Sequence, residues 1–292
     1  MSYEHIRVSR EEGIVTLAFN RPETRNSMTP AMGDELVRAV DELRADASAR
    51  VVVLTGSGKA FSSGGDLGML ARDTGAARDP RVPSSVSDSE RRSDPKGGGP
   101  AEPPPTAGPS MAGAPRDFYA RYLAIQRLPM PTIAAINGHA IGAGLCVALA
   151  CDLRIAVADA KMGMTFATLG IHPGMGGTYF LPRLVGTATA CELFFTGRIF
   201  DATEAQRLGI VNRAVPREQF DASVGGLARE IAAAAPLVTR MAKQAIYRGT
   251  HHTLEEMLDY ESLNQGITFT TADAREGVSA ILEKRSPKFV GR

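Results

Sequence analysis

The chain has 292 residues, of which 43% are hydrophobic and 22% are charged, and its formal net charge is +1. These values are typical of a globular protein with one large domain, and the balanced charge argues against a nucleic-acid partner. No apolar run is long enough to span a membrane, and the polar N-terminal residues predict no signal peptide. The three cysteines, Cys146, Cys151 and Cys191, form no C-x-x-C pair, which favours a cytoplasmic location and argues against a metal site.

The first part of the chain predicts alternating strands and helices. Short apolar runs predict strands at residues 14–19, 51–54, 132–136 and 153–157. A helix is predicted to begin at Thr29-Pro30, where a capping residue precedes proline, and another at residues 143–150. Strands that alternate with helices pair in parallel through right-handed crossovers. The sequence therefore predicts an α/β fold.

From Arg183 onward the pattern becomes helical. One apolar run, at residues 210–215, interrupts this part. The predicted helices cover residues 187–196, 203–208, 218–235, 237–248, 253–269 and 272–284. We therefore divide the chain into an α/β core over residues 1–190 and a helical C-terminal region over residues 191–292.

Residues at about 72–116 fit neither part. They contain half of the 18 prolines of the chain and the triplet Gly97-Gly98-Gly99, with few large apolar side chains. Such a composition cannot offset its ordering entropy by burial. We predict a mobile or disordered insert in the core. A flexible spacer is favoured over a segment that docks a protein partner.

Two glycine-rich turns follow predicted strands. Residues 60–67 read AFSSGGDL and residues 137–144 read NGHAIGAG. Neither has the spacing of a phosphate loop or a dinucleotide fingerprint, and each alone is typical of a tight turn. Together they allow a ligand to approach the main chain, and the second adds free N–H groups and the positive end of a helix dipole. This combination suits an oxygen atom that develops negative charge.

The two turns resemble the signature of the enoyl-CoA hydratase/isomerase (crotonase) superfamily. Further agreement covers nearly the whole chain outside residues 72–116. It lies in FNRP at 19–22, RNS at 25–27, CDL at 151–153, GIHPGMGGT at 170–178, LPRLVG at 181–186 and REG at 275–277. The resemblance implies a crotonase-like spiral of ββα units with a helical C-terminal region that forms trimers or dimers of trimers. It also implies an acyl-CoA substrate and no cofactor other than the coenzyme A that the substrate carries.

The resemblance further implies the site. The backbone N–H groups of Gly65 and Ala143 would form an oxyanion hole for the thioester carbonyl. Lys284 falls where a family lysine meets the adenine nucleotide, in some members from a neighbouring subunit, although a solvated helix end explains it equally well. The residues that would contact coenzyme A or shape its pocket are Arg25, Ser63, Gly64, Gly65, Asp66 and Leu67.

The chain departs from the hydratases of this superfamily at both catalytic glutamates. Alignment places Cys146 at the first position and Phe166 at the second. Phenylalanine transfers no proton, and the unperturbed pKa of cysteine is about 8.5. Because each general acid or base typically contributes about 10²–10⁴-fold to the rate, hydration by two glutamates is not expected.

Other side chains are candidates for the missing acid or base. His172 titrates in a useful pH range, and Cys146 near a helix start could have a lowered pKa. Simpler interpretations are a loop histidine that bonds to backbone and a small core cysteine. His139 and Tyr179 are weaker candidates.

Two functions remain open from the sequence. The first is an enzyme that stabilises an enolate or tetrahedral anion of an acyl-CoA during isomerisation, decarboxylation, hydrolysis or C–C cleavage. The second is an acyl-CoA-binding protein without catalysis, for which the same Cys146 and Phe166 argue.

Overall fold

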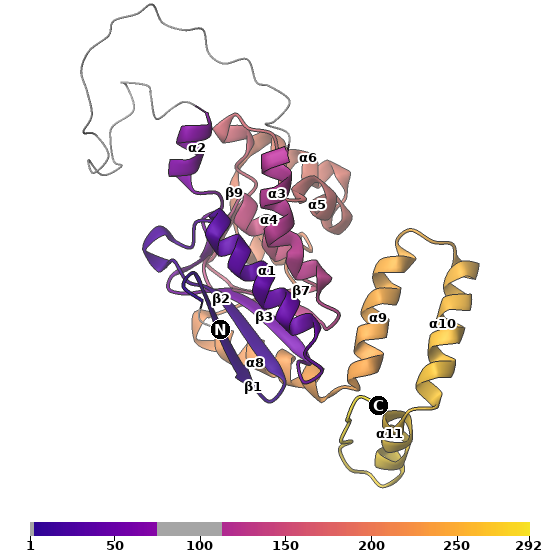
Figure 1. Ribbon diagram of the computed structural model, residues 1–292. Helices are drawn as coiled ribbons and strands as arrows, with labels where there is room; N and C mark the ends of the chain where they lie inside the picture. Colours follow the sequence, from indigo (N-terminus) through magenta and orange to yellow (C-terminus); the bar gives the residue numbers. More distant parts are fainter. Residues whose placement is uncertain (1–2, 75–112) are drawn as a thin grey trace, which may run out of the picture.

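The computed structural model describes residues 3–74 and 113–292, which form two sheets surrounded by helices (Figure 1). The larger sheet contains, in spatial order, β1 (Ile6–Glu11), β2 (Ile14–Phe19), β3 (Val51–Gly56), β5 (Thr132–Ile136), β7 (Leu153–Val157) and β10 (Arg213–Val215). The smaller contains β4 (Ala60–Ser62), β6 (His139–Ile141), β8 (Lys161–Gly163) and β9 (Ile199–Asp201). The pairs β1–β2 and β8–β9 are antiparallel and the other pairs are parallel. The predicted α/β class is confirmed.

One structural unit recurs along the core. The strand pairs β3–β4, β5–β6 and β7–β8 each place a longer strand in the large sheet and a three-residue strand in the small one. The units lead into α2 (Leu67–Asp73), α4 (Ala143–Leu149) and, through the 3₁₀ helix η6 (Ala167–Leu169), α5 (Gly177–Val185). Because β4, β6 and β8 are parallel neighbours, the residues that follow them meet at one edge of the small sheet.

The core lies between the large sheet and its covering helices. Helix α1 (Pro30–Arg44) begins where predicted, with the Thr29 hydroxyl accepting from the N–H of Met32 at 3.3 Å. It packs against α3 (Gly113–Tyr122) and η5 (Leu123–Arg127), and α8 (Arg217–Ala233) packs against β2, β3, β5 and β7. Strands β3 and β5 are almost entirely buried, as their continuous apolar runs predict.

The remaining helices complete the C-terminal part. They are α6 (Thr187–Thr196), α7 (Ala202–Arg207), α9 (Pro236–Gly249), α10 (Leu254–Phe269) and α11 (Ala272–Leu282). Figure 1 shows α9 and α10 side by side and extending away from the sheets, with α11 and the C-terminus near the base of this pair. Within the described residues, no helix combines the length and the apolar character needed to cross a membrane.

Two predicted boundaries differ from the structure. Strands β9 and β10 lie beyond residue 190 but pair with β8 and β7, so the sheets extend past the predicted end of the core. The predicted insert at 72–116 overlaps the end of α2 and the start of α3, because both helices continue into the proline-rich segment. The rest of that insert, residues 75–112, lies outside the described residues.

Candidate functional site

The two glycine-rich turns lie against each other at the edge of the small sheet. Strands β4 and β6 pair in parallel with Ala60 opposite His139, so both turns leave the sheet on the same side. A Cβ built on Gly64 would lie 2.7 Å from the carbonyl oxygen of Ile141 and 3.5 Å from the amide nitrogen of Ala143. Gly64 also has φ +89°, so both the backbone conformation and the close approach require glycine.

The backbone amides of Gly65 and Ala143 differ from those of the preceding glycines in their hydrogen bonding. The N–H of Gly64 donates to the hydroxyl of Ser62 at 3.2 Å, and that of Gly142 donates to the Gly163 carbonyl at 2.8 Å. Within residues 3–74 and 113–292, neither the Gly65 nor the Ala143 N–H makes such a bond. Ala143 is the first residue of α4, where N–H groups lack partners inside the helix. Both amides can therefore donate to a ligand.

A buried asparagine holds the first turn in place. Asn26 is fully buried, and its side-chain amide donates to the carbonyls of Ser57 at 3.0 Å and Ala60 at 2.8 Å. Its side-chain oxygen accepts from the N–H of Arg21 at 2.9 Å, and its carbonyl accepts from the Ser62 hydroxyl at 2.8 Å. The sequence predicts no role for Asn26 beyond its place in the RNS motif, which supports the family resemblance.

Arg25 and Ser63, both predicted to meet coenzyme A, are brought together. The N–H of Ser63 donates to the Arg25 carbonyl at 2.9 Å, and the Ser63 hydroxyl donates to the Thr24 carbonyl at 3.2 Å. Arg25 has a left-handed backbone with φ 56°, and its side chain is exposed. The Arg25 guanidinium is thus free to approach an anionic group beside the first turn.

Asp66 caps the helix that follows the first turn. Its carboxylate accepts from the N–H of Met69 at 3.2 Å and from the Ser27 hydroxyl at 2.9 Å, with Arg21 3.7 Å away. Burial opposes ionisation, but the Ser27 hydroxyl, the N–H groups and Arg21 together hold the pKa of Asp66 below its usual value. Leu67, the first residue of α2, is 70% exposed. The turn therefore presents an apolar side chain next to a fixed carboxylate.

Apolar side chains occupy the two positions that the resemblance assigns to the hydratase glutamates, Cys146 and Phe166. Phe166 follows β8, is 7% exposed and packs against Phe194 with ring centroids 6.4 Å apart. The sulfur of Cys146 is fully buried, and a Cβ built on Gly177 would lie 2.8 Å from it. Burial raises the pKa of the Cys146 thiol to about 12. This wall of the site therefore offers no group that ionises near neutral pH at either position.

The histidine and tyrosine candidates lie on the surface. His172 is exposed, and its Nδ1 lies 2.7 Å from the Pro173 carbonyl oxygen. His139 is exposed on β6 and accepts from the N–H of Lys161 at 3.2 Å. Tyr179 is exposed on α5 and stacks under Arg183. Among the described residues, the His172 and Tyr179 side chains are not hydrogen-bonded to either glycine-rich turn, and the His139 side chain, which belongs to the second turn, bonds to Lys161 outside it.

Lys284 lies apart from the other predicted residues. It is exposed and follows the end of α11. In Figure 1, α11 and α2 lie at opposite ends of the molecule. Within one copy of the chain, the structure therefore does not bring Lys284 to the two turns.

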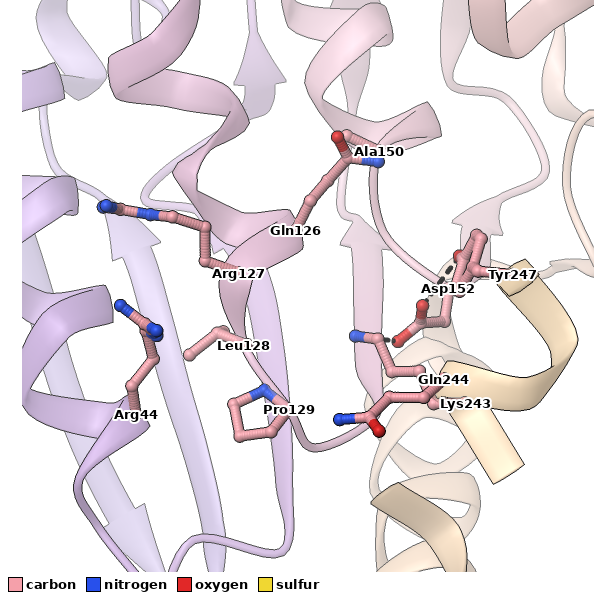
Figure 2. Close-up of a pocket in the computed structure, with 10 residues that line it drawn as sticks. All are labelled: Arg44, Gln126, Arg127, Leu128, Pro129, Ala150, Asp152, Lys243, Gln244 and Tyr247. Carbon is pink, nitrogen blue, oxygen red and sulfur yellow. Dashed lines mark hydrogen bonds and ion pairs between the residues drawn. The ribbon is translucent and has the colours of Figure 1, made fainter. Parts of the chain in front are cut away.

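A separate cavity of about 630 Å³ lies between α9 and the core (Figure 2). The Asp152 carboxylate on its wall accepts from Lys243 at 2.7 Å and from the Tyr247 hydroxyl at 2.8 Å. The same carboxylate also accepts from the Thr132 N–H at 2.7 Å. None of the predicted site residues lines this cavity. Asp152, Lys243 and Tyr247 join α9 to the sheet through these bonds.

Known proteins of one family match this chain along its whole length. The family model for enoyl-CoA hydratase/isomerase matches residues 9–88 and 110–292. A protein of Mycobacterium bovis named as a probable enoyl-CoA hydratase is 33% identical over 292 residues, with all of both chains covered. The 1,2-epoxyphenylacetyl-CoA isomerase of Escherichia coli is 35% identical over 282 residues and 97% of each chain.

Solved structures give the same result. An enoyl-CoA hydratase from Bacillus anthracis is 33% identical and has a TM-score of 0.83, covering 99% of this chain and 100% of that one. The repeated pairs of one long and one short strand are thus the crotonase-like spiral that the sequence predicts. The chain belongs to the enoyl-CoA hydratase/isomerase (crotonase) family of enzymes.

Proposed function

We propose that this protein binds an acyl-CoA and holds the thioester carbonyl oxygen between the backbone N–H groups of Gly65 and Ala143. The observation that carries the proposal is the close contact of the two turns, each with an N–H that has no partner among the described residues. A carbonyl oxygen that becomes an enolate or tetrahedral anion gains most from donors that are already in place. The helix dipole of α4 adds to this stabilisation because Ala143 is its first residue.

The reaction we propose does not use the two-glutamate hydration mechanism. Phe166 cannot exchange a proton, and the Cys146 thiol stays neutral at physiological pH. Anion-stabilising chemistry without those carboxylates includes isomerisation, decarboxylation, hydrolysis and C–C cleavage, and one relative is named as an isomerase. We retain His172 as the proposed acid or base, because its imidazole is exposed and lies in the loop that follows Phe166.

Coenzyme A would lie along the first turn. Exposed Arg25 offers a positive charge, and Ser63, Gly64, Asp66 and Leu67 shape the adjacent surface. We propose that Lys284 reaches the adenine nucleotide of a neighbouring copy, because α11 is distant from α2 within one chain (Figure 1).

A trimer, or a dimer of trimers, fits the C-terminal helices. Side chains on α9, α10 and α11 that are at least 65% exposed include Ile246, Leu254, Leu263, Phe269, Ile281 and Leu282. Apolar surface of this extent favours association. Light scattering during size-exclusion chromatography tests the assembly, and a monomer at micromolar concentration would contradict it.

Measurements of acyl-CoA binding and of turnover distinguish the enzyme from the non-catalytic binding protein. We expect the purified protein to bind acyl-CoA thioesters more tightly than it binds free coenzyme A, and to convert at least one member of a broad panel. Mass spectrometry of the panel identifies the product and hence the reaction. Tight binding without any conversion would instead favour the non-catalytic alternative, and no binding would refute both.

A further inference from the structure

The two glycine-rich turns depend on a short and irregular strand pair. Strands β4 and β6 have three residues each, and they pair Ala60 with His139 and Ser62 with Ala140, so β4 advances by two residues where β6 advances by one. Short strands with such an irregularity specify their register weakly. A slip of one residue would move one turn past the other by about 3.3 Å, the rise of a strand residue. Another contact is therefore needed to fix this register.

The side chain of Asn137 makes such a contact. Asn137 lies just before β6, and its side-chain amide donates to the carbonyls of Gly56 at 2.8 Å and Gly58 at 2.9 Å. Its side-chain oxygen accepts from the N–H of Gly56 at 3.3 Å. Gly56 ends β3, and Gly58 lies in the turn between β3 and β4. One carboxamide therefore joins the chain that enters β4 to the chain that enters β6.

The main chains of these two segments are in close contact at both ends of the strand pair. A Cβ built on Gly138 would overlap the carbonyl oxygen of Lys59, just before β4. A Cβ built on Gly144, in α4, would lie 2.6 Å from the carbonyl oxygen of Ser62, the last residue of β4. Because backbone packed this tightly cannot adjust locally, a displacement of the turn before β4 displaces β6 and the second glycine-rich turn as well.

We infer that Asn137 is a positioning residue for the proposed oxyanion pocket, because it fixes the register of β4 and β6 and with it the separation of the Gly65 and Ala143 N–H groups. The inference rests on the proposed function, in which both amides donate to one thioester oxygen. Donors of this kind act at about 2.7–3.1 Å from that oxygen. A displacement of about 1 Å takes one of them out of hydrogen-bonding range. Asn137 exerts this effect through β6 and not by contact with the substrate.

The test measures how strongly the pocket polarises a thioester carbonyl. Butyryl-CoA that is isotopically labelled at the thioester carbonyl carbon is studied by infrared difference spectroscopy, free and bound. We expect the wild-type protein to lower the carbonyl stretching frequency, because two N–H donors weaken the C=O bond. In Asn137→Ala and Asn137→Asp we expect about half of this shift or less, since misplaced turns leave one donor in range. The Asp variant keeps the size of the side chain but places an oxygen atom against the Gly56 and Gly58 carbonyls.

The matched control is Asn212→Ala. The Asn212 side-chain oxygen accepts from the N–H of Arg154 at 2.9 Å, so this variant also removes a carboxamide that is bound to backbone. It should keep the full carbonyl shift. Calorimetry with free coenzyme A shows whether each variant is folded. We expect its dissociation constant to stay within about twofold of wild type throughout, because free coenzyme A has no thioester oxygen to place between the amides.

Three outcomes would count against these claims, and they are distinct. Equal carbonyl shifts in the wild type and in both Asn137 variants would overturn the inference. Loss of coenzyme A binding in both Asn137 variants would also overturn it, because Asn137 would then support the fold in general. No shift in wild-type protein that binds butyryl-CoA would contradict the oxyanion arrangement of the proposed function, and the inference with it.

Discussion

The sulfur of Cys146 lies 3.9 Å from the sulfur of Met164, and both side chains are fully buried. This contact places Cys146 in the packed core immediately behind the start of α4. A thiol in such surroundings is a poor acid at neutral pH, because its thiolate would lie in a medium of low polarity. Its burial therefore favours a packing role over the proton transfer for which the sequence made it a candidate.

Thiol labelling tests this burial. We expect only Cys191, which is partly exposed, to react in the native protein at neutral pH, whereas all three cysteines react after unfolding. The reason is that the thiolate is the reactive form, and burial raises the pKa of both Cys146 and Cys151 to about 12. A chromogenic disulfide counts the thiols before and after denaturant is added. Labelling of Cys146 in the native state at the rate of a free thiol would contradict its assignment to the core.

His172 carries the proposed proton transfer. We expect His172→Ala to lower kcat by about 100-fold or more, the usual loss when a general acid or base is removed. His252→Ala is the matched control, because that exposed histidine contacts Glu256 at the start of α10, far along the chain from both turns. Steady-state assays on the substrate identified from the panel provide the measurement. An unchanged kcat in His172→Ala would remove His172 from the mechanism.

Ala143→Pro removes one proposed oxyanion donor with little effect on the helix. Proline is well tolerated at the first position of a helix, which Ala143 occupies in α4. We expect the single-turnover rate to fall by about 100-fold, since the N–H is replaced by a methylene group. Ala143→Ser keeps the N–H and should retain most of the activity. Equal rates for both variants would show that this amide does not stabilise the reacting oxygen.

Asp152 joins the C-terminal helices to the sheet through Lys243 and Tyr247 (Figure 2). We expect Asp152→Ala to lower the free energy of unfolding by about 3 kcal/mol, because the Lys243 ammonium, only 12% exposed, loses its carboxylate partner and keeps only the Met130 carbonyl. Tyr247→Phe removes a single hydrogen bond and should cost about 1 kcal/mol. Urea titrations followed by circular dichroism give both values. A smaller loss for Asp152→Ala than for Tyr247→Phe would contradict this description of the junction.

Sequence patterns predicted several of the long elements of this fold but missed β1 and α3. Strands β3 and β5 are continuous apolar runs, and α1 has a capping threonine followed by proline, so local signals suffice. The short strands β4, β6 and β8 were not predicted, because three residues show no periodicity. Yet these strands place the two glycine-rich turns side by side. The turns are adjacent because β4 and β6, which are far apart in the sequence, pair in parallel. Only the family resemblance predicted this pairing.

The parts of the site that depend on tertiary contacts were less predictable. Asn26 owes its position to hydrogen bonds with residues more than 30 places away, Ser57 and Ala60. The burial of Cys146 likewise depends on Met164 and on the turn before α5. A local reading of the start of α4 favours a lowered pKa for that thiol, whereas its burial raises the pKa. Burial therefore affects the pKa of the Cys146 thiol more strongly than the start of α4 does.

The central claim is that two main-chain amides share one ligand oxygen. A crystal structure of the protein with a slowly reacting acyl-CoA tests it most directly. We predict the thioester carbonyl oxygen at about 2.7–3.1 Å from both the Gly65 and the Ala143 nitrogens. A well-ordered acyl-CoA whose carbonyl oxygen contacts neither amide would contradict the account.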